Sequence, residues 1–293
     1  MKLVVTIPAF NEEQTIGKVI REIKESLGKT PYSFQILVVD DGSTDDTAKI
    51  SKAAGAIVVS HPKNYGLAES FRTEVKTCIE MHADVIVHID ADGQYRPQEI
   101  PKLVKEIEHG YDLVLGSRFL GKIESMPLVK RLGNIAFSKV ISNIAGLKIT
   151  DAQTGFRAFK IAVAENIRLI SDHTYTQEQI IRSVRHKFKV KEVPVYFAKR
   201  KDKSRLMRSP FEYAIKAWIN IFRIYRDYEP LKFFGLFGAG FLVVALLGML
   251  RLAYFYFTTG LVSHLPTMML TVLFVTIGIF IWLFAFLADM QHK

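Results

Sequence analysis

Two carboxylates, Asp90 and Asp92, follow directly after a short apolar run in the stretch V-I-V-H-I-D-A-D-G-Q, residues 85–94. The run is short and rich in β-branched residues, which is typical of a strand buried on both faces. Two like charges so close together repel each other, so they favour a cation between them. Side chains at positions i and i+2 of an extended segment point the same way, and both can therefore reach one ion. Hard carboxylate oxygens that leave room for substrate phosphates indicate Mg²⁺ or Mn²⁺.

Two other expected strand ends also carry polar residues, in P-A-F-N-E starting at Pro8 and D-D-G-S starting at Asp40. Asp40 or Asp41 can accept hydrogen bonds from a base N–H or a ribose hydroxyl, and Pro8 and Phe10 can wall the base. Ligands of parallel sheets bind beyond the carboxyl ends of the strands. We therefore expect the three strand ends to line one edge and to bind a nucleotide diphosphate.

The first 117 residues alternate between strand and helix patterns, which indicates βαβ units and a mostly parallel sheet. The expected strands are Leu3–Ile7, Gln35–Val39, Ala56–Ser60, Val85–Ile89 and Leu113–Gly116, and the expected helices are Glu12–Leu27, Asp45–Ala54, Leu67–Met81 and Pro97–His109. No G-x-G-x-x-G opens the first helix, and no complete P-loop follows a strand, which disfavours NAD and P-loop chemistry.

The C-terminal part of the 293-residue chain holds two long apolar runs, Phe233–Leu250 and Thr267–Ala288. Each is long enough to cross a hydrocarbon core of about 30 Å as a helix, and the alternative is a pair of buried core helices. The connection between the runs has no Lys or Arg, whereas basic residues crowd the segment before them. By the positive-inside rule both termini are expected in the cytoplasm, although Arg251 near the far end of the first run is an exception. The lone Cys78 fits a reducing cytoplasm, and the start of the chain does not resemble a signal peptide.

The formal charge of +10 fits nucleic acid, anionic lipid or a phosphorylated substrate as partner. Much of the excess lies between Lys187 and Arg226, next to the apolar runs, which favours lipid headgroups or a lipid phosphate over nucleic acid. Pro127–Leu147 and Pro210–Tyr228 have the pattern of amphipathic helices with basic residues opposite the apolar face. The second is expected to lie in the membrane interface, or alternatively to pack on its own domain.

Six motifs in order make the first 205 residues similar to a known family: I-P-A-F-N-E-E, V-V-D-D-G-S-T-D-D-T, N-Y-G-L-A, D-A-D-G-Q, G-S-R-F and D-A-Q-T-G-F-R-A-F. They resemble the inverting family 2 glycosyltransferases of GT-A fold, and within them the dolichol-phosphate mannose synthase and polyprenyl-phosphate glycosyltransferase branch. The resemblance implies an α/β, Rossmann-like catalytic domain over residues 1–208. A juxtamembrane helix over 209–230 and a two-helix anchor over 231–293, which could also form homo-oligomers, are expected to follow.

The resemblance also implies roles for individual residues. The nucleotide would be contacted by Pro8, Phe10, Glu12, Asp41 and Asp90, and the metal and diphosphate would be held by Asp90, Asp92 and Gln94. The acceptor phosphate would be bound by Arg118, Lys130, Arg131, Lys203 and Arg205, with Asp92, Arg118 and Arg131 as the catalytic set. Lys203 and Arg205 lie in R-K-D-K-S-R, residues 200–205. The family often has G-x-S-K at this place, so its glycine is missing here. Gln177 and Glu178 would bind the sugar, or Glu178 would only stabilise the start of a helix.

An acceptor phosphate is already anionic near neutral pH, so it can attack the sugar without a general base. It needs cations to approach the donor and a metal for the leaving group. We therefore expect inverting transfer of a sugar, with GDP-mannose as the favoured donor, to dolichyl or polyprenyl phosphate at the cytoplasmic membrane face. The alternatives are UDP-glucose or UDP-N-acetylglucosamine as donor, a polysaccharide-forming transferase, or an inactive membrane-anchored binding protein.

Overall fold

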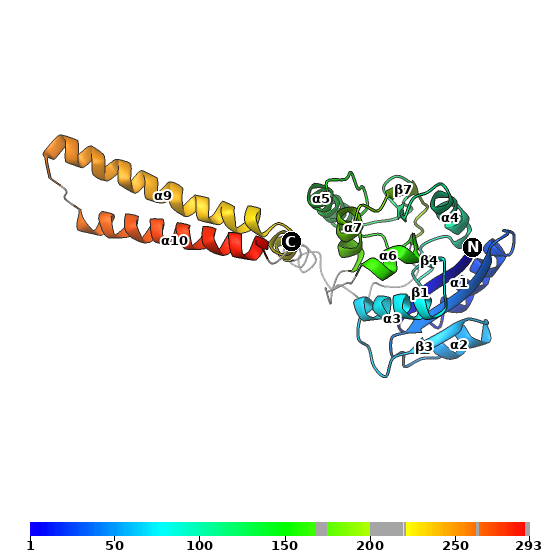
Figure 1. Cartoon of the computed structure of the whole chain (residues 1–293). Helices are drawn as coiled ribbons and strands as arrows, with labels where there is room; N and C mark the ends of the chain where they lie inside the picture. Colours follow the sequence, from blue (N-terminus) through cyan, green and yellow to red (C-terminus); the bar gives the residue numbers. More distant parts are fainter. Residues whose placement is uncertain (168–174, 200–218, 220, 262–263, 291–293) are drawn as a thin grey trace. The chain divides into compact units, whose positions relative to one another are not determined.

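The computed structural model describes residues 1–167, 175–199, 219, 221–261 and 264–290 (Figure 1). The chain divides into two compact units, Met1–Ala214 and Ile215–Lys293. The boundary expected between the catalytic domain and the juxtamembrane helix, at residues 208 and 209, falls outside the described residues.

A seven-stranded sheet with the order β3-β2-β1-β4-β6-β5-β7 forms the centre of the first unit. Among the described strands β6 alone runs antiparallel to its neighbours, β4 and β5, so the prediction of a mostly parallel sheet is confirmed. The strands are β1 (Lys2–Ala9), β2 (Ser33–Asp40), β3 (Ile57–Ser60), β4 (Val85–His88), β5 (Leu113–Ser117), β6 (Arg157–Lys160) and β7 (Val190–Pro194).

The helices of this unit agree with the sequence pattern up to α5, with small shifts at their ends. They are α1 (Ile16–Leu27), α2 (Thr47–Ala53), α3 (Leu67–Glu80), the 3₁₀ turn η1 (Pro97–Glu99), α4 (Ile100–Glu108), α5 (Leu128–Ala145), α6 (Ile161–Asn166) and α7 (Tyr175–Arg185). The first helix begins at Ile16 and not at Glu12, because the carbonyl of Glu12 accepts the amides of Thr15 and Ile16 in a preceding turn.

Alternating side chains of β1 face two helical layers, because successive residues of a strand point to opposite sides of the sheet. Leu3, Val5 and Ile7 are fully buried in the core formed with α1 and α4. On the other face the hydroxyl of Thr6 donates a 2.8 Å hydrogen bond to Glu74 of α3. The sheet thus has a helical layer on each face.

The second unit contains two long apolar helices, α9 (Pro230–Thr259) and α10 (Leu265–Met290). An 18-residue window has a mean hydropathy of 2.4 in α9 and of 2.6 in α10. Both are long and apolar enough to cross a membrane, and they contain the two predicted spans. Glycines let them approach closely, because a Cβ at Gly238 would lie 2.5 Å from the ring of Trp282. Residues 221–228 before α9 are helical, and most of the earlier part of the expected juxtamembrane helix lies outside the described residues.

Candidate active site

The three polar strand ends meet at one edge of the sheet, as the sequence predicts. β2, β1 and β4 are parallel neighbours, and Ala9 pairs with Asp40 at the end of the β1–β2 ladder. β5 ends at the same edge, immediately before Arg118. Because β6 runs in the opposite direction, its first residue, Arg157, pairs with His88 at the end of β4. The edge therefore combines carboxylates from the parallel strands with two arginines.

Asp90 and Asp92 lie in the turn that follows β4, and Gln94 closes this turn. The side chain of Asp90 is 34% exposed. The Gln94 amide donates a 3.0 Å hydrogen bond to Asp92 Oδ1. The side chain of Gln94 donates through Nε2 to the carbonyl of Ala198, and the Ala198 amide donates back to the Gln94 carbonyl. Gln94 thus ties the turn to the segment after β7, and its expected contact with a metal stays a prediction.

The donor set of this turn fits a hard divalent cation. Across the described residues, no three His, Cys, Asp or Glu side chains form a cluster that could hold an ion by themselves. Two carboxylates at a strand end suit Mg²⁺ or Mn²⁺, which usually keep waters and take further oxygens from substrate phosphates. Asp90 and Asp92 are the side chains that would hold such an ion.

Asp41 is buried and shapes the neighbouring loop. Its carboxylate accepts hydrogen bonds from the amides of Tyr65 and Gly66, at 2.9 and 2.8 Å, and His61 Nδ1 lies 2.7 Å from Oδ1. These contacts fix the chain just before α3, where Gly66 has φ +92°, a value that favours glycine. The expected contact of Asp41 with a nucleotide would share a carboxylate that already has three partners.

The segment after β1 presents an aromatic side chain beside this loop. Phe10 is 38% exposed, and Pro8 is half-buried within β1. Asn11, with φ 55°, accepts the Thr44 amide through its side chain. The Glu12 carboxylate accepts a 3.0 Å hydrogen bond from the Thr15 hydroxyl. A partly exposed aromatic ring at this edge is suited to stacking on a base.

Arg118 lies at the end of β5 and is paired with Asp151. It is 5% exposed, and its Nε and Nη2 donate to the two carboxylate oxygens of Asp151 at 2.7 and 2.8 Å. Burial alone would lower the pKa of the guanidinium, but Tyr95 and Asp151 raise it above its ordinary value. The structure therefore places Arg118 in a buried ion pair that ties the end of β5 to D-A-Q-T-G-F-R, and its expected contact with the acceptor phosphate stays a prediction.

Lys130 and Arg131 lie in the first turn of α5, and both are exposed. Beside them Leu128 and Leu132 are 75% and 66% exposed, so the start of α5 presents cations together with apolar side chains. The other two cations expected at the acceptor phosphate, Lys203 and Arg205, lie outside the described residues.

Gln177 and Glu178 are buried in the first turns of α7, at 4% and 3% exposure. Glu178 Oε1 accepts a 2.8 Å hydrogen bond from Arg182, one turn along the helix. This position agrees with the alternative in which an acidic side chain stabilises the helix start. The Oε1 atom of Gln177 is buried and has no hydrogen-bond partner in the structure as described. A sugar contact by either side chain remains a prediction.

Arg157, a buried charged residue at this edge, was not predicted from the sequence to be part of the site. Arg157 is fully buried, and its Nη1 donates to Gln179 Oε1 at 2.8 Å while Nη2 donates to the Thr154 carbonyl. Burial lowers the pKa of this guanidinium, and the nearby hydroxyls and carboxylates act in the opposite direction. The available signal was a charged residue inside the otherwise apolar end of D-A-Q-T-G-F-R-A-F.

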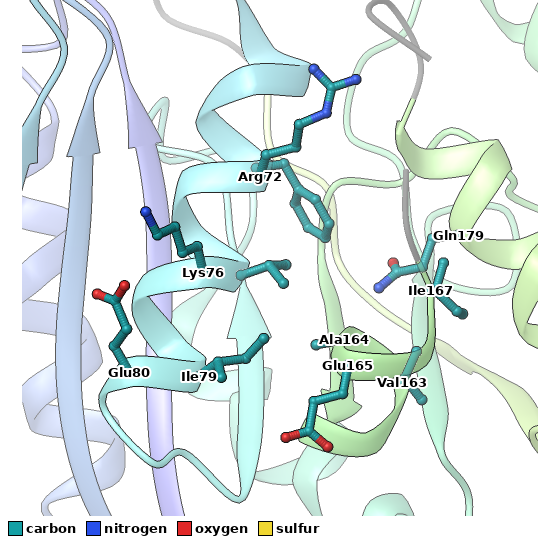
Figure 2. A pocket seen from close by; sticks show the side chains of 11 residues that line it. Arg72, Lys76, Ile79, Glu80, Val163, Ala164, Glu165, Ile167 and Gln179 are labelled. Atoms are coloured by element: carbon teal, nitrogen blue, oxygen red, sulfur yellow. The ribbon is translucent and has the colours of Figure 1, made fainter. Parts of the chain in front are cut away.

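A hollow of about 940 Å³ lies between α3 and α6 (Figure 2). Its lining is mainly apolar, with Arg72, Lys76, Glu80 and Glu165 among the polar side chains. Of the residues predicted from the sequence to bind nucleotide, metal or acceptor, none that the structure describes lines it. The chemistry expected at the carboxyl ends of the strands is therefore separate from this hollow.

The fold and the motifs at its edge define a glycosyltransferase. The profile of the glycosyl transferase family 2 matches residues 4–168, and the chain belongs to this family.

Two named relatives match this chain over most of their own length. A dolichyl-phosphate hexose transferase of Haloferax volcanii is 31% identical over 70% of this chain and 86% of its own. A UDP-N-acetylglucosamine–dolichyl-phosphate N-acetylglucosaminyltransferase of Methanococcus voltae is 32% identical over 64% of this chain and 82% of its own. Glucosyl-3-phosphoglycerate synthase from Mycobacterium tuberculosis, solved with Mn²⁺, UDP-glucose and phosphoglyceric acid, has a similar fold. Its TM-score is 0.60 at 21% identity, over 76% of this chain and 78% of that one.

Proposed function

We propose that the protein transfers a hexose from a nucleotide diphosphate sugar to a polyprenyl phosphate at the cytoplasmic face of a membrane, with inversion at the anomeric carbon. The observation that carries the proposal is D-A-D-G-Q at the end of β4, in a family 2 domain followed by two helices long enough to span a membrane. Two relatives named for transfer to dolichyl phosphate support the acceptor class.

The donor side of the site is built around the strand ends. Asp90 and Asp92 would hold Mg²⁺ or Mn²⁺, which when bound neutralises the leaving diphosphate. The fold neighbour solved with Mn²⁺ and UDP-glucose supports a divalent cation here. Phe10 would stack on the base, and the loop fixed by Asp41 would border the ribose. GDP-mannose remains our favoured donor from the sequence, and the names of the relatives make UDP-glucose and UDP-N-acetylglucosamine the competing donors.

The acceptor side would use the start of α5. Lys130 and Arg131 provide exposed cations for a lipid phosphate, and Leu128 and Leu132 provide apolar surface for its chain. Because the phosphate is already an anion at neutral pH, these cations reduce its repulsion from the donor diphosphate and no side chain has to remove a proton. Arg118 would act indirectly, by holding Asp151 and the loop behind the metal turn.

A transfer assay tests the proposal directly. Membranes containing the full chain are supplied with polyprenyl phosphate and, in separate reactions, with radiolabelled GDP-mannose, UDP-glucose and UDP-N-acetylglucosamine. We expect one donor to label the solvent-extractable lipid, and a chelator or Asp92→Ala to abolish this labelling while the protein stays in the membrane. Labelling of a water-soluble or polymeric product in place of the lipid would overturn the acceptor assignment, and turnover unaffected by the chelator would remove the cation.

A further inference from the structure

The carboxylate of Asp90 is packed directly against Gly155. A Cβ built on this glycine would lie 2.7 Å from each carboxylate oxygen and 3.0 Å from Cγ. Gly155 does not have the left-handed φ that by itself requires glycine. The residue is therefore needed for space, because any side chain at this position would occupy the volume of the Asp90 carboxylate.

The second wall around this carboxylate is the imidazole of His88, whose Nε2 lies 3.9 Å from Asp90 Oδ1. His88 is fully buried, with Nδ1 2.6 Å from Glu74 Oε2 and Nε2 2.8 Å from the Tyr175 hydroxyl. Burial raises the pKa of Tyr175 well above its ordinary value, so the hydroxyl keeps its proton and can donate to Nε2. Both ring nitrogens then have partners, and the ring cannot turn without breaking a buried hydrogen bond.

The backbone around Gly155 is fixed as well. The Thr154 carbonyl accepts from Arg157, and the Thr154 hydroxyl donates to the Gly116 carbonyl at 2.7 Å. The Phe156 carbonyl accepts the Gly116 amide at 2.8 Å. A methyl group added at Gly155 would therefore move the partly exposed Asp90 side chain more easily than it would move the backbone.

We propose that Gly155 and His88 form a slot that holds the Asp90 carboxylate in one orientation, which makes both of them positioning residues for the cation and diphosphate of the donor. The slot rests on the proposed function, because Asp90 is taken as a ligand of that cation. The slot would keep the Asp90 carboxylate in place before the donor binds. This matters because a displacement of about 1 Å in a site of this kind can cost about 100-fold in rate.

Gly155→Ala in the full chain tests the slot through binding as well as turnover. The binding measurement is calorimetric titration of the detergent-solubilised protein with GDP and UDP, each with and without Mn²⁺. We expect Gly155→Ala to weaken the Mn²⁺-dependent binding about tenfold or more, with a melting temperature close to that of the wild type. In an Asp90→Ala background the same substitution should cause no further loss, because the group it displaces is gone.

Two outcomes separate this inference from the proposed function. If the wild type shows no Mn²⁺-dependent binding of either nucleotide, the proposed function and the slot both fail. If the wild type binds and Gly155→Ala binds within about twofold of it, or if Gly155→Ala causes an equal loss in the Asp90→Ala background, the slot alone is overturned.

A second variant keeps the inference testable if Gly155→Ala does not fold. Tyr175→Phe removes only the hydroxyl that contacts His88 and keeps the ring stacked on Phe71, whose centroid lies 4.2 Å away. We expect Mn²⁺-dependent nucleotide binding to weaken about threefold. The matched control is Tyr32→Phe, which removes an exposed hydroxyl that donates to Glu108 and should leave binding unchanged. Equal binding by the two variants would contradict the role of His88.

Discussion

Asp151 and Arg118 form a buried ion pair at the edge that carries the metal turn. Removing one charge leaves the other without compensation in a place that water does not reach, which typically costs about 3 to 5 kcal/mol. We expect Asp151→Asn to lower the free energy of unfolding by about 3 kcal/mol. Thermal unfolding of the solubilised full chain by calorimetry measures this loss. Asp112→Asn is the matched control, because its partner Lys160 is 35% exposed and the loss should be about 1 kcal/mol or less. Equal losses would show that Asp151 is not protected from solvent.

The carboxylate of Asp112 should also make the free energy of unfolding depend on pH. Partial burial acts to raise its pKa, but hydrogen bonds from Lys160 Nζ and the Lys189 amide, each 2.8 Å long, hold the pKa below its ordinary value of 3.8. A depressed pKa means that the ionised group stabilises the folded state above pH 3.8, and that this contribution is lost as the pH falls through the folded-state value.

The difference in melting temperature between the wild type and Asp112→Asn isolates this contribution from other titrating groups. We expect the difference to be constant above about pH 5 and to shrink on acidification below it. A difference that grows as the pH falls would have the wrong sign for a depressed pKa.

At the scale of elements, the sequence predicts the βαβ part of the sheet well, because its strands are apolar runs between helices of regular period. It does not predict β6, whose four residues include Arg157 and Lys160 and therefore lack the apolar pattern of the other strands. The insertion of β6 between β4 and β5 depends on pairing between distant segments, which local pattern does not encode.

Contacts between distant segments of the chain also limit what the sequence predicts about the site. Asp90 and Asp92 could be found from the sequence because both follow one apolar strand. The roles of Asp151 and Gly155 could not, because each depends on a partner more than 30 positions away, Arg118 for the first and Asp90 for the second. The ion pair of Arg118 with Asp151 could not be predicted for this reason, and a contact of Arg118 with the acceptor phosphate stays a prediction.

The first turn of α5 is proposed to bind the acceptor phosphate, and this can be tested by mutation. Lys130→Gln combined with Arg131→Gln removes two exposed positive charges from its first turn. We expect the apparent KM for polyprenyl phosphate to rise about tenfold, while the KM for the sugar donor stays the same, because only the approach of the anionic acceptor is weakened. Steady-state kinetics in membranes measure both constants. Lys139→Gln, on an exposed position further along α5, is the matched control, and an equal effect of this variant would assign the loss to general surface charge.

For the whole molecule, the positive-inside pattern predicts that the family 2 domain lies in the cytoplasm and that the connection between α9 and α10 lies on the opposite side. The chain suits cysteine labelling, because its lone Cys78 is buried and burial raises the pKa of the thiol, so the wild type should react only after denaturation. In intact cells a membrane-impermeant maleimide should label Leu261→Cys, a position that is 68% exposed between the two helices. The side chain of Lys49, in α2, is 82% exposed. The maleimide should label Lys49→Cys only after the membrane is opened. Labelling of Lys49→Cys in intact cells and protection of Leu261→Cys would reverse the orientation, and would place the proposed site on the side of the membrane away from cytoplasmic nucleotide sugars.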